Sequence, residues 1–336
     1  MKYMSLETRI AGAIVGMTLG DSLGMPGELW PKSYIQNRLG FIDTFKDGPK
    51  DNEVACYFSA GQYTDDSAQA LLFLDAICEY NTIPEPKILA DKLLAWIDEV
   101  NGFEKNLLGV SSKAALLAHS KNEDYTQYTT KAETNGAAMR IAPVGCVVAG
   151  DDLEQMAKAV AKVSKVTHST DVTIAGASMV AQAVASAILG KNFDEILEDV
   201  YKIHDIALAM GTPTYSANSK ARLQVAISLL SKCKTDEEVS QMIYDVIGTG
   251  VLSSEAVPAA LAIAYYCQNP EKAAIMCANL GGDTDTIGAM ACAICGAYTG
   301  IEGIRPEWIK IIEKANNIDF KEYTTKTLIA REKFNL

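Results

Sequence analysis

Helical periodicity runs through most of the chain and constrains the fold more than any other feature of the sequence. Apolar residues recur at i, i+3 and i+4, the spacing that forms one face of an α-helix. Alanine is abundant in these segments, where it favours helix and lets helices pack closely. The segments are residues 6–23, 67–80, 86–100, 153–165, 172–189, 193–209, 217–231, 237–247, 255–266, 271–279 and 287–298. Because no run alternates apolar and polar residues as a strand does, the sequence predicts an all-α fold.

Two stretches interrupt the helical pattern and are predicted to be loops. Residues 24–62 are rich in glycine, proline, aspartate and aromatic residues, and residues 119–134 form the second stretch. A loop as long as the first, inside a compact domain, is usually functional. No Pro/Ser-rich linker or shift in composition divides the chain. Residues 1–336 are therefore predicted to form a single domain, although a chain of this length is often two.

Charge and cysteine usage bound the partners and the compartment. The net charge of −12 disfavours nucleic acid, because a face for the phosphate backbone needs clustered basic residues. Cys292 and Cys295 form a CxxC within a small-residue helical run, where buried thiols are expected instead of a redox or zinc pair. Residues 1–9 lack the form of a signal peptide, and the longest apolar stretch, residues 287–299, is too short to span a bilayer. A cytoplasmic monomer without membrane contact is expected.

Two clusters of oxygen-bearing side chains stand at the starts of predicted apolar helices. The first is Thr64–Asp65–Asp66, and the second is Asp283–Thr284–Asp285–Thr286. A single Asp or Thr in such a place is explained by helix capping, in which a side-chain oxygen accepts from free backbone N–H groups. A cap needs one oxygen, however, and each cluster offers several in succession.

Crowding is the second reason to look beyond capping. Carboxylates at one helix start repel each other unless a cation lies between them. The four carboxylates, together with the threonine hydroxyls, form an all-oxygen set that suits hard cations such as Mg²⁺ or Mn²⁺. Gly281 and Gly282 allow a tight turn that directs Asp283 and Asp285 the same way. Because a helical bundle can bring two helix starts to one rim, the clusters are predicted to form one divalent-cation site.

Seven blocks of sequence, in order along the chain, carry a resemblance to a known family. The blocks are GAIVGMTLGDSLGMPGE (12–28), YTDDS (63–67), NGAAMRIAP (135–143), TH (167–168), VPAAL (257–261), NLGGDTDTI (279–287) and IRPEW (304–308). Because of these blocks, the chain resembles the ADP-ribosylglycohydrolase family. That family includes the hydrolase that reactivates dinitrogenase reductase and the eukaryotic ADP-ribosylhydrolases. The match extends from Ile10 to Trp308.

The resemblance implies an orthogonal all-α bundle with a binuclear Mg²⁺ or Mn²⁺ centre. The metal ligands it implies are Thr64, Asp65, Asp66, Asp283, Asp285 and Thr286. Glu28 matches a glutamate on a mobile active-site loop of the family, so Glu28 and Asp283 are the candidates for proton transfer. The positions that match the lining of the ADP-ribose cleft are Gly109, Ser111, Asn135, Gly136 and His168.

The departures from the family pattern lie on the substrate side. Ser22 stands where the family more often has alanine, and no proline occurs near Asp171. The sequence Leu29–Trp30–Pro31 after Glu28 is not a general family feature. These differences leave the metal site unaffected and the acceptor group open.

The family's reaction is hydrolysis of the bond between C1″ of the distal ribose and an acceptor, through an oxocarbenium-like transition state. The expected substrate is therefore an ADP-ribosylated protein or a small molecule that contains ADP-ribose. Two alternatives stay open. The scaffold could instead hydrolyse a free nucleoside or another ribosyl metabolite. It could also be a catalytically silent, crystallin-like binding protein, for which loss of metal ligands is the expected sign.

Overall fold

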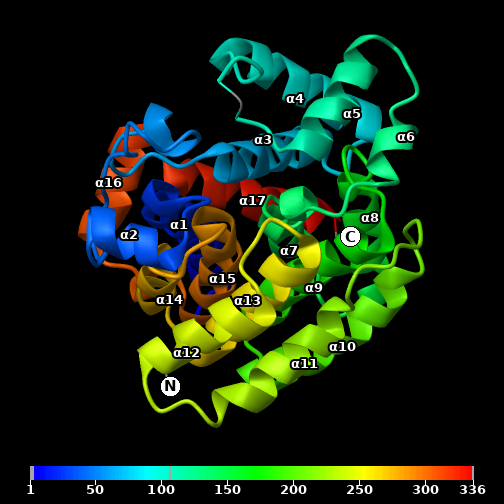
Figure 1. Cartoon of the computed structure of the whole chain (residues 1–336). Coiled ribbons are helices and arrows are strands. Elements are labelled where there is room, and N and C mark those ends of the chain that lie inside the picture. The colour runs from blue at the N-terminus through cyan, green and yellow to red at the C-terminus, as the bar shows by residue number, and fades with distance from the viewer. Residues whose placement is uncertain (1–3, 106, 335–336) are drawn as a thin grey trace.

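The structure is a computed structural model that describes residues 4–105 and 107–334. Helices make up its regular structure, as Figure 1 shows. In these two ranges the only β-type pairings are isolated bridges, among them Trp30–Gly282 and Thr134–Leu252. The predicted all-α class is confirmed.

The α-helices follow one another along the chain with short connections. They are α1 (Leu6–Gly24), α2 (Lys32–Leu39), α3 (Asp65–Tyr80), α4 (Pro86–Val100), α5 (Val110–Ser120), α6 (Thr126–Thr129), α7 (Ala142–Val147), α8 (Leu153–Ser164), α9 (Asp171–Ile188), α10 (Phe193–Leu208), α11 (Ser219–Leu230), α12 (Asp236–Met242), α13 (Ser253–Cys267), α14 (Pro270–Ala278), α15 (Thr284–Thr299), α16 (Pro306–Asn316) and α17 (Phe320–Phe334). The shorter turns are η1 (Met25–Gly27), η2 (Ala55–Tyr57), η3 (Asn135–Ala137), the π-turn η4 (Ile243–Ile247) and η5 (Ile301–Gly303).

The predicted helices are all present, with small shifts at their ends, but the loop predictions are partly wrong. Residues 24–62 contain α2, and residues 119–134 contain the short helix α6. The sequence pattern missed α2 because Ile35 is its one buried residue, so it carries no apolar stripe. The helices α5, α7, α16 and α17 were missed as well.

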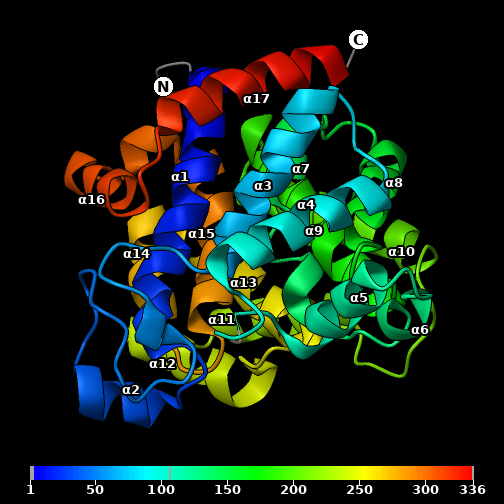
Figure 2. The same cartoon turned by 90° about the horizontal axis from the view of Figure 1, so that it is seen from above.

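A stripe of glycines lets α1 and α15 lie almost in backbone contact. A Cβ on Gly12 would lie 2.1 Å from the carbonyl oxygen of Gly296, and a Cβ on Gly20 would lie 2.0 Å from that of Gly288. A Cβ on the opposing glycines would also meet α1, at 2.5 Å for Gly288 and 2.0 Å for Gly296, and Figure 2 shows α15 beside α1. This close approach places the start of α15 against the end of α1.

The core extends from α1 and α15 to α9 and the helices around it. α9 is long and apolar enough to cross a bilayer, yet 94% of it is buried in the protein, as in the central helix of a globular core. Residues 287–299 are therefore not the longest apolar segment. Cys292 and Cys295 are fully buried free thiols, as predicted. Core residues come from both ends of the described chain, and the single domain of residues 1–336 stays a prediction because residues 1–3, 106, 335 and 336 lie outside the description.

Candidate active site

One cavity, of about 340 Å³, gathers most of the residues that the sequence singled out. Its walls come from the turn after α1, the starts of α3, α5 and α15, and η3. The predicted site residues that line it are Glu28, Thr64, Asp65, Asp66, Gly109, Asn135, Gly136, Asp283 and Thr286. The two acidic clusters, far apart in the sequence, therefore meet at one cavity.

Three predicted residues do not line the cavity. On α5, Ser112 lines it in place of Ser111, because adjacent residues of a helix point in different directions. Asp285 lies behind the wall, where its Oδ2 accepts from the Thr64 hydroxyl at 3.4 Å. His168 is fully buried behind Gly136, and a Cβ on Gly136 would lie 2.7 Å from its ring.

The start of α3 is held from below by Asp21 of α1. Its two carboxylate oxygens accept from the backbone N–H groups of Thr64, at 2.8 Å, and of Ser67, at 2.9 Å. Thr64 is the N-cap of α3, and its hydroxyl accepts from the N–H of Asp66 at 3.4 Å. Asp21 was not among the predicted site residues, although it is the one charged residue between Ile10 and Gly24 and is fully buried. A lone charge in an apolar helix is the signal that identifies it.

The start of α15 is shaped by a glycine pair and by neighbouring loops. Gly281 and Gly282 both have φ of +86°, a left-handed conformation that glycine adopts without strain. The N–H of Asp283 donates to the carbonyl of Thr249 at 2.7 Å, and its carboxylate accepts from the amide of Asn135 at 2.5 Å. The side chain of Asp283 does not cap α15, so its carboxylate is available to the cavity.

The acidic side chains of the two clusters raise one another's pKa values. Burial, and then the charges of Asp21 and Asp283, raise the pKa of Asp65 to about 7. Burial and the charge of Asp65 raise the pKa of Asp66 well above its usual range. Burial and the charge of Asp66 do the same to Asp285. A cation, or shared protons, that neutralises carboxylates in this situation stabilises them.

The donor set fits a hard divalent cation. Oδ2 of Asp66 and Oδ1 of Asp285 are buried and have no hydrogen-bond partner in the described part of the chain. Such an atom carries a desolvation cost that an ion removes. No three acidic, histidine or cysteine side chains among the described residues are already arranged to hold a metal ion.

Arg140 supplies a buried positive charge beside the acidic clusters. One guanidinium nitrogen donates to the side-chain oxygen of Gln69, whose amide donates to Oδ2 of Asp65 at 2.7 Å. The other donates to the hydroxyl of Thr167. Burial lowers the pKa of Arg140 to about 10, while the charges of Asp65 and Asp66 oppose the shift. Arg140 thus orients Asp65 through Gln69.

His168 ends this chain of hydrogen bonds as a neutral base. Thr167 lies 2.7 Å from its Nδ1, and Thr134 lies 2.8 Å from its Nε2. Because the Thr167 oxygen accepts from Arg140, its hydrogen can donate to Nδ1, which leaves Nε2 as the donor to Thr134. Burial and the charge of Arg140 lower the pKa of His168 to about 3. His168 therefore supports the cavity wall and does not contact the cavity.

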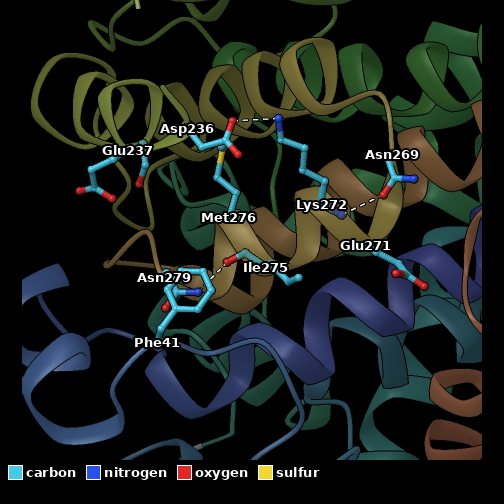
Figure 3. Close-up of a pocket in the computed structure, with 10 residues that line it drawn as sticks. Phe41, Asp236, Glu237, Asn269, Glu271, Lys272, Ile275, Met276 and Asn279 are labelled. Carbon is cyan, nitrogen blue, oxygen red and sulfur yellow. Dashed lines mark hydrogen bonds and ion pairs between the residues drawn. The ribbon is translucent and has the colours of Figure 1, made fainter. Parts of the chain in front are cut away.

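A second cavity, of about 490 Å³, lies between α12 and α14 beside Phe41 (Figure 3). Its charged side chains pair within the protein: Lys272 lies 2.8 Å from Asp236, and Glu271 pairs with Arg305. None of the predicted site residues lines it. The cavity with the acidic clusters is therefore the candidate active site.

The chain is similar to known proteins over almost its whole length. The model of the ADP-ribosylglycohydrolase family matches residues 3–333. The uncharacterized protein YegU of Escherichia coli K12 is 40% identical over 318 residues, which cover 94% of this chain and 95% of that protein. The human ADP-ribosylhydrolase ARH3 is 25% identical over 348 residues, which cover 93% of this chain and 91% of that protein.

A solved structure gives the same result for the fold. The structure described as an ADP-ribosylglycohydrolase-related protein complex superimposes with a TM-score of 0.70 and 20% identity, and the alignment covers 98% of this chain and 99% of that chain. At that identity the likeness establishes the fold. Together with the family match over nearly the whole sequence, it shows that the chain belongs to the ADP-ribosylglycohydrolase family.

Proposed function

We propose that the protein is a divalent-cation-dependent glycohydrolase, which hydrolyses the bond between C1″ of an ADP-ribosyl group and a protein side chain or small molecule. The observation that carries the proposal is the shared cavity, which both acidic clusters and Glu28 line. The buried, unpartnered oxygens of Asp66 and Asp285 support the cation requirement. The family match supports the reaction class.

The cations are proposed to be two Mg²⁺ or Mn²⁺ ions. The residues proposed to hold them are Thr64, Asp65, Asp66, Asp283, Asp285 and Thr286. When bound, such ions supply positive charge that orients the ribose 2″ and 3″ hydroxyls and lowers the pKa of water. The protein's part is to hold the ligands in place, through Asp21 at α3 and Asn135 at α15.

Glu28 is the preferred group for proton transfer. Burial raises the pKa of both Glu28 and Asp283, so the pKa shift does not separate the two candidates. The carboxylate of Asp283 already accepts from Asn135 and is proposed to bind a cation, whereas Glu28 is not one of the proposed cation ligands. A carboxyl group with a raised pKa can both take and return a proton near neutral pH. In the proposed reaction the oxygen of water bonds to C1″, and the breaking C1″ bond leaves its electron pair on the acceptor atom. Glu28 takes the proton from water, and the acceptor atom receives one proton in return.

One observation favours the second candidate, hydrolysis of a nucleoside or another ribosyl compound without phosphate. Among the described residues that line the cavity, none is a lysine or arginine, so no basic side chain there faces a diphosphate. Backbone N–H groups can bind phosphate in their place. Both candidate functions cleave a glycosidic bond of a ribose, and they differ in whether the substrate carries the diphosphate of ADP-ribose.

A substrate panel tests the proposal. ADP-ribosyl-arginine, ADP-ribosyl-serine, O-acetyl-ADP-ribose and nucleosides are incubated with the protein and Mg²⁺ or Mn²⁺, with EDTA as the control. We expect release of ADP-ribose from one or more of the ADP-ribosylated compounds, abolished by EDTA and by Asp283→Asn or Asp285→Asn. Release of free base from nucleosides alone supports the second candidate. Undiminished hydrolysis in EDTA contradicts the cation requirement.

A thermal-shift measurement separates an enzyme from a silent binding protein. All six proposed ligand positions are intact, which disfavours the silent alternative. That alternative predicts stabilisation by ADP-ribose without turnover of any compound in the panel. The cytoplasmic location, the monomeric state and the absence of membrane and nucleic-acid partners are part of the same proposal.

A further inference from the structure

Asn52 joins two segments that line the cavity, one with Glu28 and Leu29 and the other with Val54 and Phe58. Although it lies in a loop, it is 1% exposed. Its amide nitrogen donates to the backbone carbonyl of Glu28 at 2.9 Å. Its side-chain oxygen accepts from the N–H groups of Val54, at 3.0 Å, and of Ala55, at 2.9 Å. A buried side chain with both ends bonded in this way limits the movement of the segments that it connects.

The backbone around Glu28, the Glu28 turn (residues 25–30), is held at further points. The N–H of Glu28 donates to the carbonyl of Met25 at 3.2 Å. The N–H of Leu29 donates to the carbonyl of Gly282 at 2.8 Å, and the N–H of Gly282 donates back to Trp30 at 2.9 Å. The Glu28 turn is therefore coupled to the residue before Asp283.

Leu29 shows that these bonds hold a strained conformation. Its φ is +58°, in the left-handed region that a leucine rarely occupies. Such a conformation costs about 1 kcal/mol or more and persists only where its surroundings determine it. Without the contacts to Asn52 and Gly282, Leu29 would relax and Glu28 would move with it.

We propose that Asn52 is a positioning residue for Glu28. Its amide fixes the Glu28 carbonyl, and through the backbone it sets where the carboxylate lies in the cavity. Val54 and Phe58, from the same segment as Asn52, line the cavity too, so one side chain aligns this wall with the proton-transfer group. This inference rests on the proposed role of Glu28 in hydrolysis.

Two substitutions isolate the bond to Glu28. Asn52→Asp has the same shape and keeps the oxygen that accepts from Val54 and Ala55, but it loses the donor to Glu28. Asn52→Ser keeps a short oxygen that can cap the same turn, adds no charge and cannot reach the Glu28 carbonyl. Asn218→Asp is the matched control, because it makes the same change at the N-cap of α11, where aspartate also caps well.

The activity test is a double-mutant cycle. Each Asn52 variant is expected to lower kcat about tenfold to a hundredfold with KM nearly unchanged. The melting temperature is expected to fall as well, because a buried hydrogen bond is lost. In a Glu28→Gln background the same variants are expected to cost nothing further, because Asn52 acts through Glu28. An equal loss in both backgrounds, or no loss in either, overturns the inference.

A second readout does not depend on the substrate. Hydrogen–deuterium exchange of residues 25–35 is expected to accelerate in both Asn52 variants, while residues 284–299 and the Asn218→Asp control exchange as in the wild type. Unchanged exchange of residues 25–35 overturns the inference. If the wild-type protein hydrolyses no compound of the panel, the proposed function fails, and exchange alone then decides whether Asn52 holds the Glu28 turn.

Discussion

Replacing Gly20 by alanine tests whether the glycine stripe builds the active site. The added Cβ would lie 2.0 Å from the carbonyl oxygen of Gly288 and 2.2 Å from its carbonyl carbon. Ordinary contacts between such atoms are about 3.5 Å, so α1 and α15 have to separate locally by about 1.5 Å. The helices cannot tilt freely, because Gly16 is equally close to Cys292, with a Cβ distance of 2.2 Å to its oxygen.

The expected loss of stability follows from two opposing effects. Overpacking in a rigid backbone contact costs about 3 kcal/mol or more. Alanine recovers about 1 kcal/mol, because it favours helix over glycine. The free energy of unfolding should therefore fall by about 2 kcal/mol or more. The affinity for Mg²⁺ should fall too, because separation of the helices moves Asp285 on α15 away from Thr64, which Asp21 holds to α1.

Urea unfolding followed by far-UV circular dichroism measures the stability, and titration calorimetry measures the Mg²⁺ affinity. Gly102→Ala is the matched control, since its Cβ would meet its nearest neighbours, Ile97 and Val100, at 3.4 Å, an ordinary contact. We expect the control to change stability by less than about 1 kcal/mol. A Gly20→Ala protein with the wild-type urea midpoint and Mg²⁺ affinity would refute the reasoning.

Three further predictions concern buried polar groups around the site. Asp21→Asn leaves one oxygen for two N–H donors at the start of α3, so stability should fall by about 1–3 kcal/mol in urea unfolding, and an unchanged midpoint contradicts this. Arg140→Met removes the charge that orients Asp65 and leaves Gln69 and Thr167 without a donor. A loss of about 3–5 kcal/mol is expected in the same assay, and a loss below 1 kcal/mol would argue against a structural charge. His168, with a pKa of about 3 when folded, stays neutral in the native state, whereas the unfolded chain binds a proton below about pH 6.5. Its contribution to stability is therefore lost as the pH falls from 6.5 toward 3, by up to about 1.4 kcal/mol per pH unit. His168→Gln should flatten the acid limb of a stability–pH profile by that slope, and an identical limb in both proteins excludes the effect.

The local pattern of the sequence was enough to predict most of the helices. Periodicity at i, i+3 and i+4 reports which face of a helix is buried, so strongly amphipathic segments such as α8 and α10 were predicted well. α2 lies on the surface with Ile35 as its single buried residue, so its sequence has no periodic apolar pattern that would predict a helix. The Gly20–Gly288 contact joins positions far apart in the chain, and no local pattern specifies it.

By itself, the sequence determined the class of fold, the two acidic clusters and their oxygen chemistry, because these follow from residue type and near-neighbour spacing. Only the tertiary structure decided which side chains share the cavity. It brought Thr64 and Asp283 together, placed His168 behind Gly136, and turned Ser112 toward the cavity in place of Ser111. It also revealed Asp21 and Asn52, which act through long-range hydrogen bonds. The physical reason is that helix direction and close packing set side-chain positions, and packing depends on partners that lie far along the chain.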